Sequence, residues 1–430
     1  MKPDSPCSLA VTGVGALLPT GIGPQALWQA WCNQQSGFSS FSTRWLQSRL
    51  IPRYGHIAAE HEEQARQLVP HKLRRYASQS TLWGVHAAQQ AMTSAGLEPT
   101  ETPSERRGLF TAQADYSNPS LQGFQRVITA GQDEYGFDLY RATQEAFLRR
   151  GVDPFIAIKS LANNQLALLS LTYHFKGAGG AFVQNESACL AALDAARFSL
   201  EQRECDWALV VSSGSYLCPL TLKALYQSGE LSTHSTADAL HSFDPSQSGT
   251  VLANGAIALV LERADHALAR GAQIQCFIRG LGSHSPIQAG KCEAKDYYHA
   301  IQRAGIEPAQ MNTDAILVTG HGGHHQDEAE LSALRQLPEV NSTPVTTVRP
   351  VVGSVAGCGP LIDVVLAKNI FAENYLPAIP FLSQTNAAHP ALLTQGLSKP
   401  LKRLLCLHQG RTGFCSAIEL THPLSSENMR

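Results

Sequence analysis

Three histidines lie close together after a short apolar run: His321, His324 and His325 follow residues 316–318. Imidazole nitrogens bind zinc, and they also exchange protons near neutral pH. A zinc site of the protease type needs two histidines four residues apart with a glutamate beside the first. No carboxylate has that spacing here, so we expect no metal site at these histidines.

Ten cysteines are spread from Cys7 to Cys415, and no two of them form a Cys-x-x-Cys pair. Zinc sites and disulfide frameworks normally show such paired spacing. We therefore expect neither, and we expect the cysteines to fill cores as small hydrophobic side chains.

A glycine-rich segment near the start, residues 11–23, could be mistaken for a nucleotide-binding loop. Its glycines do not have the G-x-G-x-x-G spacing, and Pro19 interrupts the place where a helix would have to begin. A dinucleotide fingerprint needs both features, so we expect no nucleotide site.

The composition excludes several classes of protein. Of 430 residues, 43% are hydrophobic and 16% charged, with a formal net charge of -2. Such a chain can fold around a core and has no dense cationic face for nucleic acid. No apolar run has the ~18 residues of a membrane helix, and the first residues resemble no signal peptide. We expect a cytoplasmic protein that binds neither nucleic acid nor membrane.

Buried strands and helices alternate along the chain, which is typical of an α/β fold. Short apolar runs predict strands at residues 9–11, 207–211, 257–261, 316–318 and 404–407. Apolar residues at helical spacing predict helices at 85–95, 188–200 and 360–371. The segments 206–214 and 314–320 have a similar strand-to-glycine pattern, which suggests a duplicated half.

Four segments together resemble the β-ketoacyl-acyl carrier protein synthases, the condensing enzymes of fatty-acid and polyketide assembly. They are the opening strand and loop at 11–23, the helix entry at 71–97, the run at 243–252 that continues to 266–272, and Gly357-Cys358-Gly359. The run that begins Phe243-Asp244-Pro245 is the most specific of them. The resemblance covers nearly the whole chain.

The resemblance implies a thiolase-like α/β fold of two duplicated halves in a five-layered αβαβα arrangement. We expect the halves to span residues 1–264 and 265–430, and we expect a dimer. In this family a cysteine at a helix N-terminus takes the acyl chain, two histidines stabilise the enolate, and backbone N–H groups form an oxyanion hole. No cofactor is bound, because phosphopantetheine arrives on a carrier protein.

The nucleophile position of the family falls on Glu186. Counting nine residues from Gly177 and counting back from the strand at Trp207 both give this residue. A carboxylate cannot form the thioester intermediate. Cys189 lies almost one helical turn further on, where we expect it to pack in the core.

The rest of the family's active site is partly kept and partly replaced. His321 matches the first histidine. Ser354 replaces the second histidine and Arg349 the lysine before it, while Gly410 and Arg411 replace Gly-Phe in the C-terminal oxyanion loop. We expect Glu186 to pair with His321 or Arg411 and to fill the pocket.

This pattern is similar to the chain-length factor, or ketosynthase β subunit, of type II polyketide synthases. That resemblance implies an acyltransferase-family chain without catalysis of its own, which pairs with an active ketosynthase, meets an acyl carrier protein and shapes the acyl tunnel. Residues 109–126 resemble the tunnel lining. Three alternatives stay open: a decarboxylase of malonyl-carrier protein, an active synthase that uses Cys189, and a purely structural partner.

Overall fold

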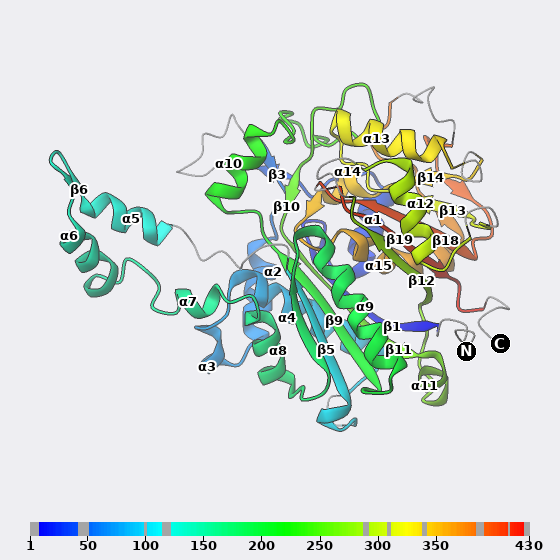
Figure 1. Cartoon of the computed structure of the whole chain (residues 1–430), viewed down its shortest axis with the longest axis horizontal. Coiled ribbons are helices and arrows are strands. Elements are labelled where there is room, and N and C mark those ends of the chain that lie inside the picture. The colour runs from blue at the N-terminus through cyan, green and yellow to red at the C-terminus, as the bar shows by residue number, and fades with distance from the viewer. Residues whose placement is uncertain are drawn as a thin grey trace.

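A long mixed β-sheet runs through the molecule and consists of two halves with the same topology (Figure 1). The computed structural model describes residues 8–41, 51–98, 101–113, 122–286, 292–307, 311–337, 342–383, 391–411 and 413–424. In space the first half is ordered β8 (Gly179–Val183), β5 (Arg107–Gln113), β9 (Trp207–Gly214), β11 (Gly255–Arg263) and β1 (Leu9–Leu18). The second half is ordered β14 (Val345–Thr346), β13 (Ala315–Leu317), β18 (Arg403–Gln409), β19 (Cys415–Thr421) and β12 (Cys276–His284).

Both halves have the same strand order, and they join where β1 pairs antiparallel with β12. Numbered along the chain within each half, the order in space is third, second, fourth, fifth, first. The strand directions agree as well, because the pairings β5–β8 and β5–β9 are parallel, as are β13–β14 and β13–β18. The expected duplication is therefore confirmed, whereas the boundary at residue 264 stays a prediction.

The repeated strand-to-glycine pattern that suggested the duplication compares strands that are not equivalent. Residues 206–214 form β9, the fourth strand of the first half, whereas residues 314–320 include β13, the second strand of the other half. The pairing inferred from the sequence was wrong because any buried strand that ends in a polar turn has this pattern.

Helices form three layers around the sheet. On one outer face α4 (Gln79–Ala95) packs against β1, β9 and β11, beside α2 (Ala59–Leu68) and α8 (Asn164–Tyr173). The middle layer contains α9 (Ala188–Glu201), α15 (Gly359–Glu373) and α1 (Gly23–Cys32). On the other outer face lie α12 (Ala294–Arg303) and α13 (His324–Arg335). With the two halves of the sheet between them, these three helix layers make up the five expected layers.

The sequence explains why these helices lie where they do. The middle helix α15 is apolar nearly all round and almost completely buried, as a helix between two layers must be. Helix α4 begins at Ser78, whose side chain accepts the Thr81 N–H, and ends at Gly96 with a φ of 63°. A Cβ atom at Gly13 or Gly15 would collide with backbone oxygens of α4, so the glycines of the opening strand allow close helix packing.

The remaining elements are short. Small ladders form between β1 and β2 (Gly21–Ile22), β3 (Ser39–Ser40) and β4 (Arg53–Tyr54), β10 (Leu252–Ala253) and β15 (Ser354–Val355), and β16 (Tyr375–Leu376) and β17 (Leu397–Ser398). The other helical segments of the body are α3 (His71–Arg74), η1 (Ser104–Arg106), α7 (Ile156–Lys159), η3 (Asn185–Ser187), α10 (Pro219–Gln227), α11 (Ala264–Ala269) and α14 (Arg349–Val352).

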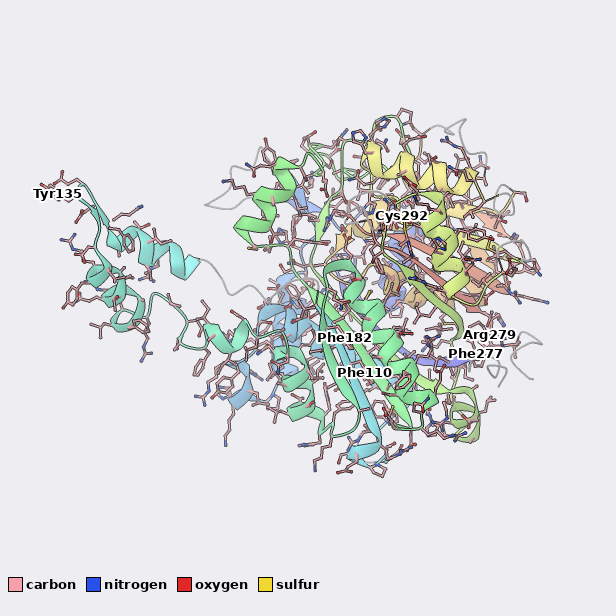
Figure 2. All side chains as sticks on the ribbon, viewed as in Figure 1. Phe110, Tyr135, Phe182, Phe277, Arg279 and Cys292 are labelled. Atoms are coloured by element: carbon pink, nitrogen blue, oxygen red, sulfur yellow. A yellow bond between two sulfur atoms is a disulfide. The ribbon has the colours of Figure 1, made fainter. Side chains whose placement is uncertain are left out.

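One segment projects away from the body, and we call it the arm (residues 122–148; Figure 1). It contains α5 (Gln122–Gly131), β6 (Gln132–Asp133), β7 (Gly136–Phe137), α6 (Leu139–Thr143) and the π-helical turn η2 (Gln144–Leu148). Large apolar side chains on it are exposed, and Tyr135 lies at its tip (Figure 2). Residues 116–150 have little hydrophobic pattern in the sequence, which is typical of a surface or interface insertion, and residues 116–121 lie outside the described residues.

Two observations concern the cysteines and the membrane. Cys292 and Cys415 form a disulfide, so for these two residues the prediction of separate core-filling cysteines was wrong. The spacing gave no signal because they are 123 residues apart in sequence. Six other cysteines are buried as predicted, whereas Cys32 is exposed, so the prediction was wrong for it as well. Cys7 lies outside the described residues. Within the described residues, every helix is too short or too polar to span a membrane.

Candidate active site

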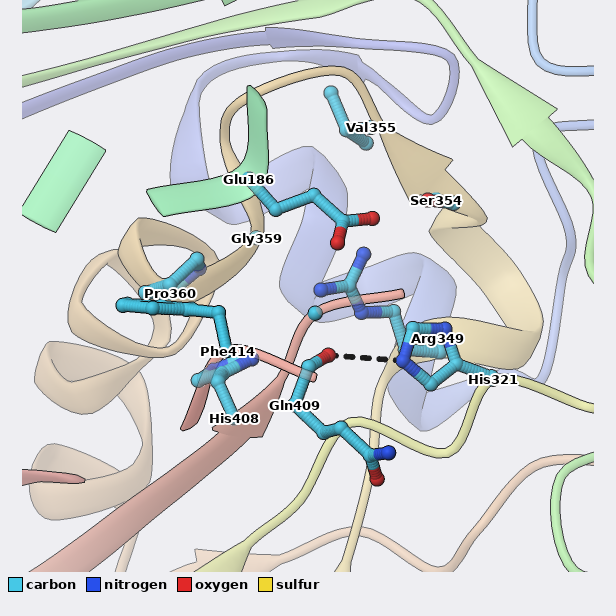
Figure 3. A pocket seen from close by; sticks show the side chains of 11 residues that line it. Glu186, His321, Arg349, Ser354, Val355, Gly359, Pro360, His408, Gln409 and Phe414 are labelled. Carbon is cyan, nitrogen blue, oxygen red and sulfur yellow. Dashed lines mark hydrogen bonds between the residues drawn. The ribbon is translucent and has the colours of Figure 1, made fainter. Parts of the chain in front are cut away.

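Five of the six predicted site residues line one small cavity between the two halves (Figure 3). Its volume is ≈ 20 Å³, which is room for about one water molecule. Its lining consists of Glu186, His321, Arg349, Ser354, Val355, Gly359, Pro360, His408, Gln409, Gly410 and Phe414. The sixth predicted residue, Arg411, contacts the cavity wall through Glu186.

Glu186 lies in the turn η3, directly before α9, and its carboxylate points into the cavity (Figure 3). Oε2 accepts a hydrogen bond from the backbone N–H of Arg411 at 2.6 Å, and Oε1 lies 3.3 Å from the guanidinium Nη2 of Arg411. Burial alone would raise the pKa of this carboxyl, but the charges of Arg411 and Arg349 and the Arg411 N–H outweigh it. The pKa is therefore below its usual value and Glu186 is ionised at neutral pH.

Arg411 holds Glu186 and also contacts two residues that the sequence did not single out. Its Nη2 donates to the Tyr216 hydroxyl at 2.8 Å, and the guanidinium carbon lies 4.9 Å from the centre of the Tyr216 ring. Its Nε lies 3.6 Å from Oε2 of Glu230. The expected pairing of Glu186 with Arg411 is confirmed.

His321 is buried, and its Nε2 lies 2.8 Å from the backbone oxygen of Gln409 (Figure 3). A carbonyl oxygen only accepts hydrogen bonds, so Nε2 must carry the proton. Burial lowers the pKa of His321 to about 4, and the ring is neutral at pH 7. The Nε2–H of His321 therefore donates to the Gln409 oxygen and not to Glu186.

Arg349 and Ser354 lie on the same side of the cavity as His321. Arg349 begins α14 and is 8% exposed, with Nη1 donating to the Gly353 oxygen at 3.1 Å. Ser354 begins β15 and is also buried. A serine hydroxyl offers one neutral donor, whereas a second imidazole could support a developing enolate more strongly.

Cys189 lies inside α9, away from the cavity. It is fully buried in the hydrophobic core, and its Sγ contacts the Glu186 backbone oxygen at 3.7 Å. Burial raises the pKa of the thiol, which leaves it uncharged and weakly nucleophilic at neutral pH. This is the packing role that the sequence predicted.

Two carboxylates on α13 fix the loop that carries His321. Asp327 accepts the N–H groups of Phe243 and Gly322, and Glu330 accepts those of Thr319 and Gly320. These are the Asp and Glu that follow the histidine motif. They orient the loop, and neither lines the cavity.

A buried pair at the cavity edge was missed by sequence reasoning. His408 Nε2 lies 2.6 Å from Asp363 Oδ2, and both side chains are almost completely buried. His408 is in β18 and Asp363 in α15. The sequence contained a signal for this pair, because Asp363 is the one charged residue in the apolar run of residues 360–367. Tyr216 and Glu230 gave no such signal.

The charged side chains of the site do not form a metal centre. Among the described residues, no group of three or more histidine, cysteine, aspartate or glutamate side chains could hold a metal ion. Glu186 contacts a guanidinium and Asp363 an imidazole, so both carboxylates already have cationic or hydrogen-bonding partners.

Comparisons with known proteins show which proteins this chain resembles. The sequence model described as beta-ketoacyl synthase, N-terminal domain, matches residues 8–267. A relative from Streptomyces glaucescens, the tetracenomycin polyketide synthase ketoacyl synthase beta subunit, is 27% identical over 429 residues, with 96% of this chain and 98% of the relative covered. The 3-oxoacyl-[acyl-carrier-protein] synthase 2 of Vibrio harveyi is 24% identical, with 86% and 87% covered.

Solved structures share the fold. The ishigamide ketosynthase/chain length factor superposes with a TM-score of 0.79 at 17% identity, covering 96% of this chain and 99% of that one. A beta-ketoacyl synthase from Burkholderia phymatum gives a TM-score of 0.80 at 17% identity, covering 97% and 99%. These likenesses establish the thiolase-like fold. With its sheet topology, its histidine loop and the match over residues 8–267, the chain belongs to the beta-ketoacyl synthase family.

Proposed function

We propose that this chain is the chain-length-factor subunit of a type II polyketide synthase. It pairs in the cytoplasm with a catalytic ketosynthase, forms no acyl-enzyme itself and shapes the tunnel in which the chain grows. The acyl carrier protein delivers phosphopantetheine-bound substrates to the pair.

The observation that carries the proposal is the Glu186 carboxylate in the cavity, at the position that the family motif assigns to the nucleophile. Both of its oxygens face Arg411, one toward the backbone N–H and one toward the guanidinium. A cavity of ≈ 20 Å³ has no room for an acyl thioester. Since the Nε2–H of His321 is bonded to Gln409 and Ser354 stands for the second histidine, the groups that would stabilise an enolate are missing as well.

Two surfaces support a partner subunit. The arm exposes an apolar set in which every member is more than 70% exposed, namely Tyr135, Leu139, Tyr140, Phe147 and Leu148. Within the described residues, strand β8 ends the sheet of the first half with an unpaired edge. Large exposed apolar patches and open edge strands are typical of surfaces that another chain covers.

The proposal is tested by reconstituting the pair with a type II ketosynthase, its carrier protein and malonyl units. Replacing the partner's nucleophilic cysteine should abolish product, whereas Glu186→Ala in this chain should leave the product yield within about two-fold of the wild type, as expected for a residue outside the chemistry. Loss of product with Glu186→Ala, in a pair that still assembles by size-exclusion chromatography, would contradict the proposal.

Control of chain length is tested separately in the segment 109–126, of which residues 114–121 lie outside the described part. Gln113 ends β5 at the entry to this segment. We expect Gln113→Trp to shorten the polyketide because bulk is added to the tunnel wall, with Gln113→Ala as the matched control. An unchanged product length from an intact pair would refute this part of the proposal.

A further inference from the structure

The loop that closes the candidate site is short and tightly folded. The N–H of Gly410 donates to the Phe414 oxygen at 2.7 Å, and the N–H of Gly413 donates to the Gly410 oxygen at 2.9 Å. Gly413 has a φ of 87°, which favours glycine. The residues on either side, Gln409 at the end of β18 and Cys415 at the start of β19, pair with each other in the sheet. Both ends of this closing loop (residues 410, 411, 413 and 414, with Thr412 outside the described residues) are therefore held by strands.

Arg411 fixes the loop between these strands to three separate segments of the first half. Glu186 precedes α9, Tyr216 follows β9, and Glu230 follows α10. All three contact the same guanidinium, and Glu186 also accepts the Arg411 backbone N–H. The exposed fractions of the charged side chains are 13% for Arg411, 19% for Glu186 and 22% for Glu230.

We propose that Arg411 is an electrostatic latch that locks the closing loop over the candidate site and couples the two halves of the fold. One guanidinium faces two carboxylates in a largely buried place. The positive charge of Arg411 therefore offsets the repulsion between the two carboxylates. Such a group is costly to break, because removal of one partner leaves buried charge without compensation. The latch concerns the conformation of the loop and does not depend on whether the chain sets polyketide length.

The fit of the loop against Glu186 supports the latch. A Cβ atom at position 410 would lie 2.7 Å from Oε2 of Glu186, so the carboxylate would have to move. Glycine at position 410 therefore leaves the carboxylate in place to accept the Arg411 N–H. Gly410→Ala should therefore disturb the latch without changing any charge.

The charges that remain in each variant predict a specific order of loop opening. Arg411→Met leaves Glu186 and Glu230 without their shared cation, so the loop should open. Glu186→Gln leaves Arg411 and Glu230 as a one-to-one pair, so its effect should be smaller. In the double variant Glu186→Gln/Arg411→Met only one carboxylate remains, and the loop should open less than in Arg411→Met alone.

Hydrogen–deuterium exchange of the full chain, read by mass spectrometry on a peptide that spans the closing loop, measures this opening. We expect exchange at the loop to be about ten-fold faster in Arg411→Met than in the wild type, with smaller increases in Glu186→Gln and Gly410→Ala. The matched control is Arg335→Met, because Arg335 forms an ion pair with Glu328 on the exposed face of α13. It should leave loop exchange unchanged.

Peptides from β9 and β11 report whether each variant is folded. If they stay protected while loop exchange in Arg411→Met remains at the wild-type rate, the latch is refuted. If Arg411→Met does not fold, Glu186→Gln and Gly410→Ala decide, and wild-type loop exchange in both would overturn the proposal. The failure of the latch would leave the acyl-transfer tests of the proposed function unaffected.

Discussion

His321 is a buried imidazole whose protonation makes the stability of the protein depend on pH. Its pKa in the folded protein is about 4, below the value of 6.5 of the free side chain, because it is buried. A group whose pKa is lowered on folding resists protonation only in the folded state. Above pH 6.5 His321 is neutral in both states and the free energy of unfolding has its full value. As the pH falls toward 4, His321 is protonated in the unfolded chain but not in the folded protein, and the free energy of unfolding falls.

We expect the free energy of unfolding to fall by about 2 kcal/mol between pH 7.5 and 5.0 through His321 alone, since one pKa unit corresponds to 1.36 kcal/mol. Urea unfolding of wild type and His321→Asn at both pH values isolates this contribution. The pKa of Glu186 is lowered from 4.5, so its effect begins at lower pH. An equal pH dependence in the two proteins would mean that His321 is already protonated or exposed.

Cys189 is the other residue whose state can be measured directly. Because it is fully buried, we expect its thiol to resist alkylation in the native protein, whereas Cys32, which is exposed, should react. Peptide mass spectrometry after brief treatment with iodoacetamide reads both sites in one sample. Rapid modification of Cys189 under native conditions would favour the alternative in which this thiol attacks substrate.

At the scale of elements, β18 and α15 are tied together by His408 and Asp363. Removing one member of a buried pair leaves the other uncompensated and typically costs about 3 kcal/mol or more. We therefore expect Asp363→Ala to lower the free energy of unfolding by about 3 kcal/mol, measured by chemical denaturation. In the double variant Asp363→Leu/His408→Leu the loss should be smaller, because no buried polar group is left without its partner. A larger loss in the double variant would contradict this account.

The sequence predicted the strands and helices better than the contacts between distant segments. Continuous apolar runs predicted β9, β11 and β18, because strands covered on both faces must be apolar throughout. Helix α15 was predicted from Pro360 onward and begins one residue earlier. The site residues were predicted from motif spacing, which is local. Tyr216, Glu230 and the Cys292–Cys415 disulfide depend on how distant segments meet, and single-sequence patterns do not contain that information.

For the whole molecule, the arm is the surface on which the proposed pairing with a ketosynthase depends. Its apolar residues have no cover within the described part of the chain, whereas the body has a continuous core. We expect Tyr140→Glu together with Phe147→Glu to prevent pairing with the ketosynthase, because charge would have to be buried at the interface. Analytical ultracentrifugation of the mixed subunits measures pairing, and circular dichroism verifies the fold.

The matched control for the arm is Arg150→Glu, which adds an acidic side chain at an already exposed position beside the arm. It should leave pairing intact. If the apolar-to-acidic variant still forms the pair with wild-type affinity, the arm is not the contact surface.

The central claim is that this chain holds a cavity closed and forms no covalent intermediate. The most direct measurement is the intact mass of each subunit after the reconstituted pair has been incubated with an acylated carrier protein. We predict an acyl adduct on the ketosynthase partner and an unmodified mass for this chain. An acyl adduct on this chain, located at Glu186, at Cys189 or elsewhere in the cavity, would contradict the account.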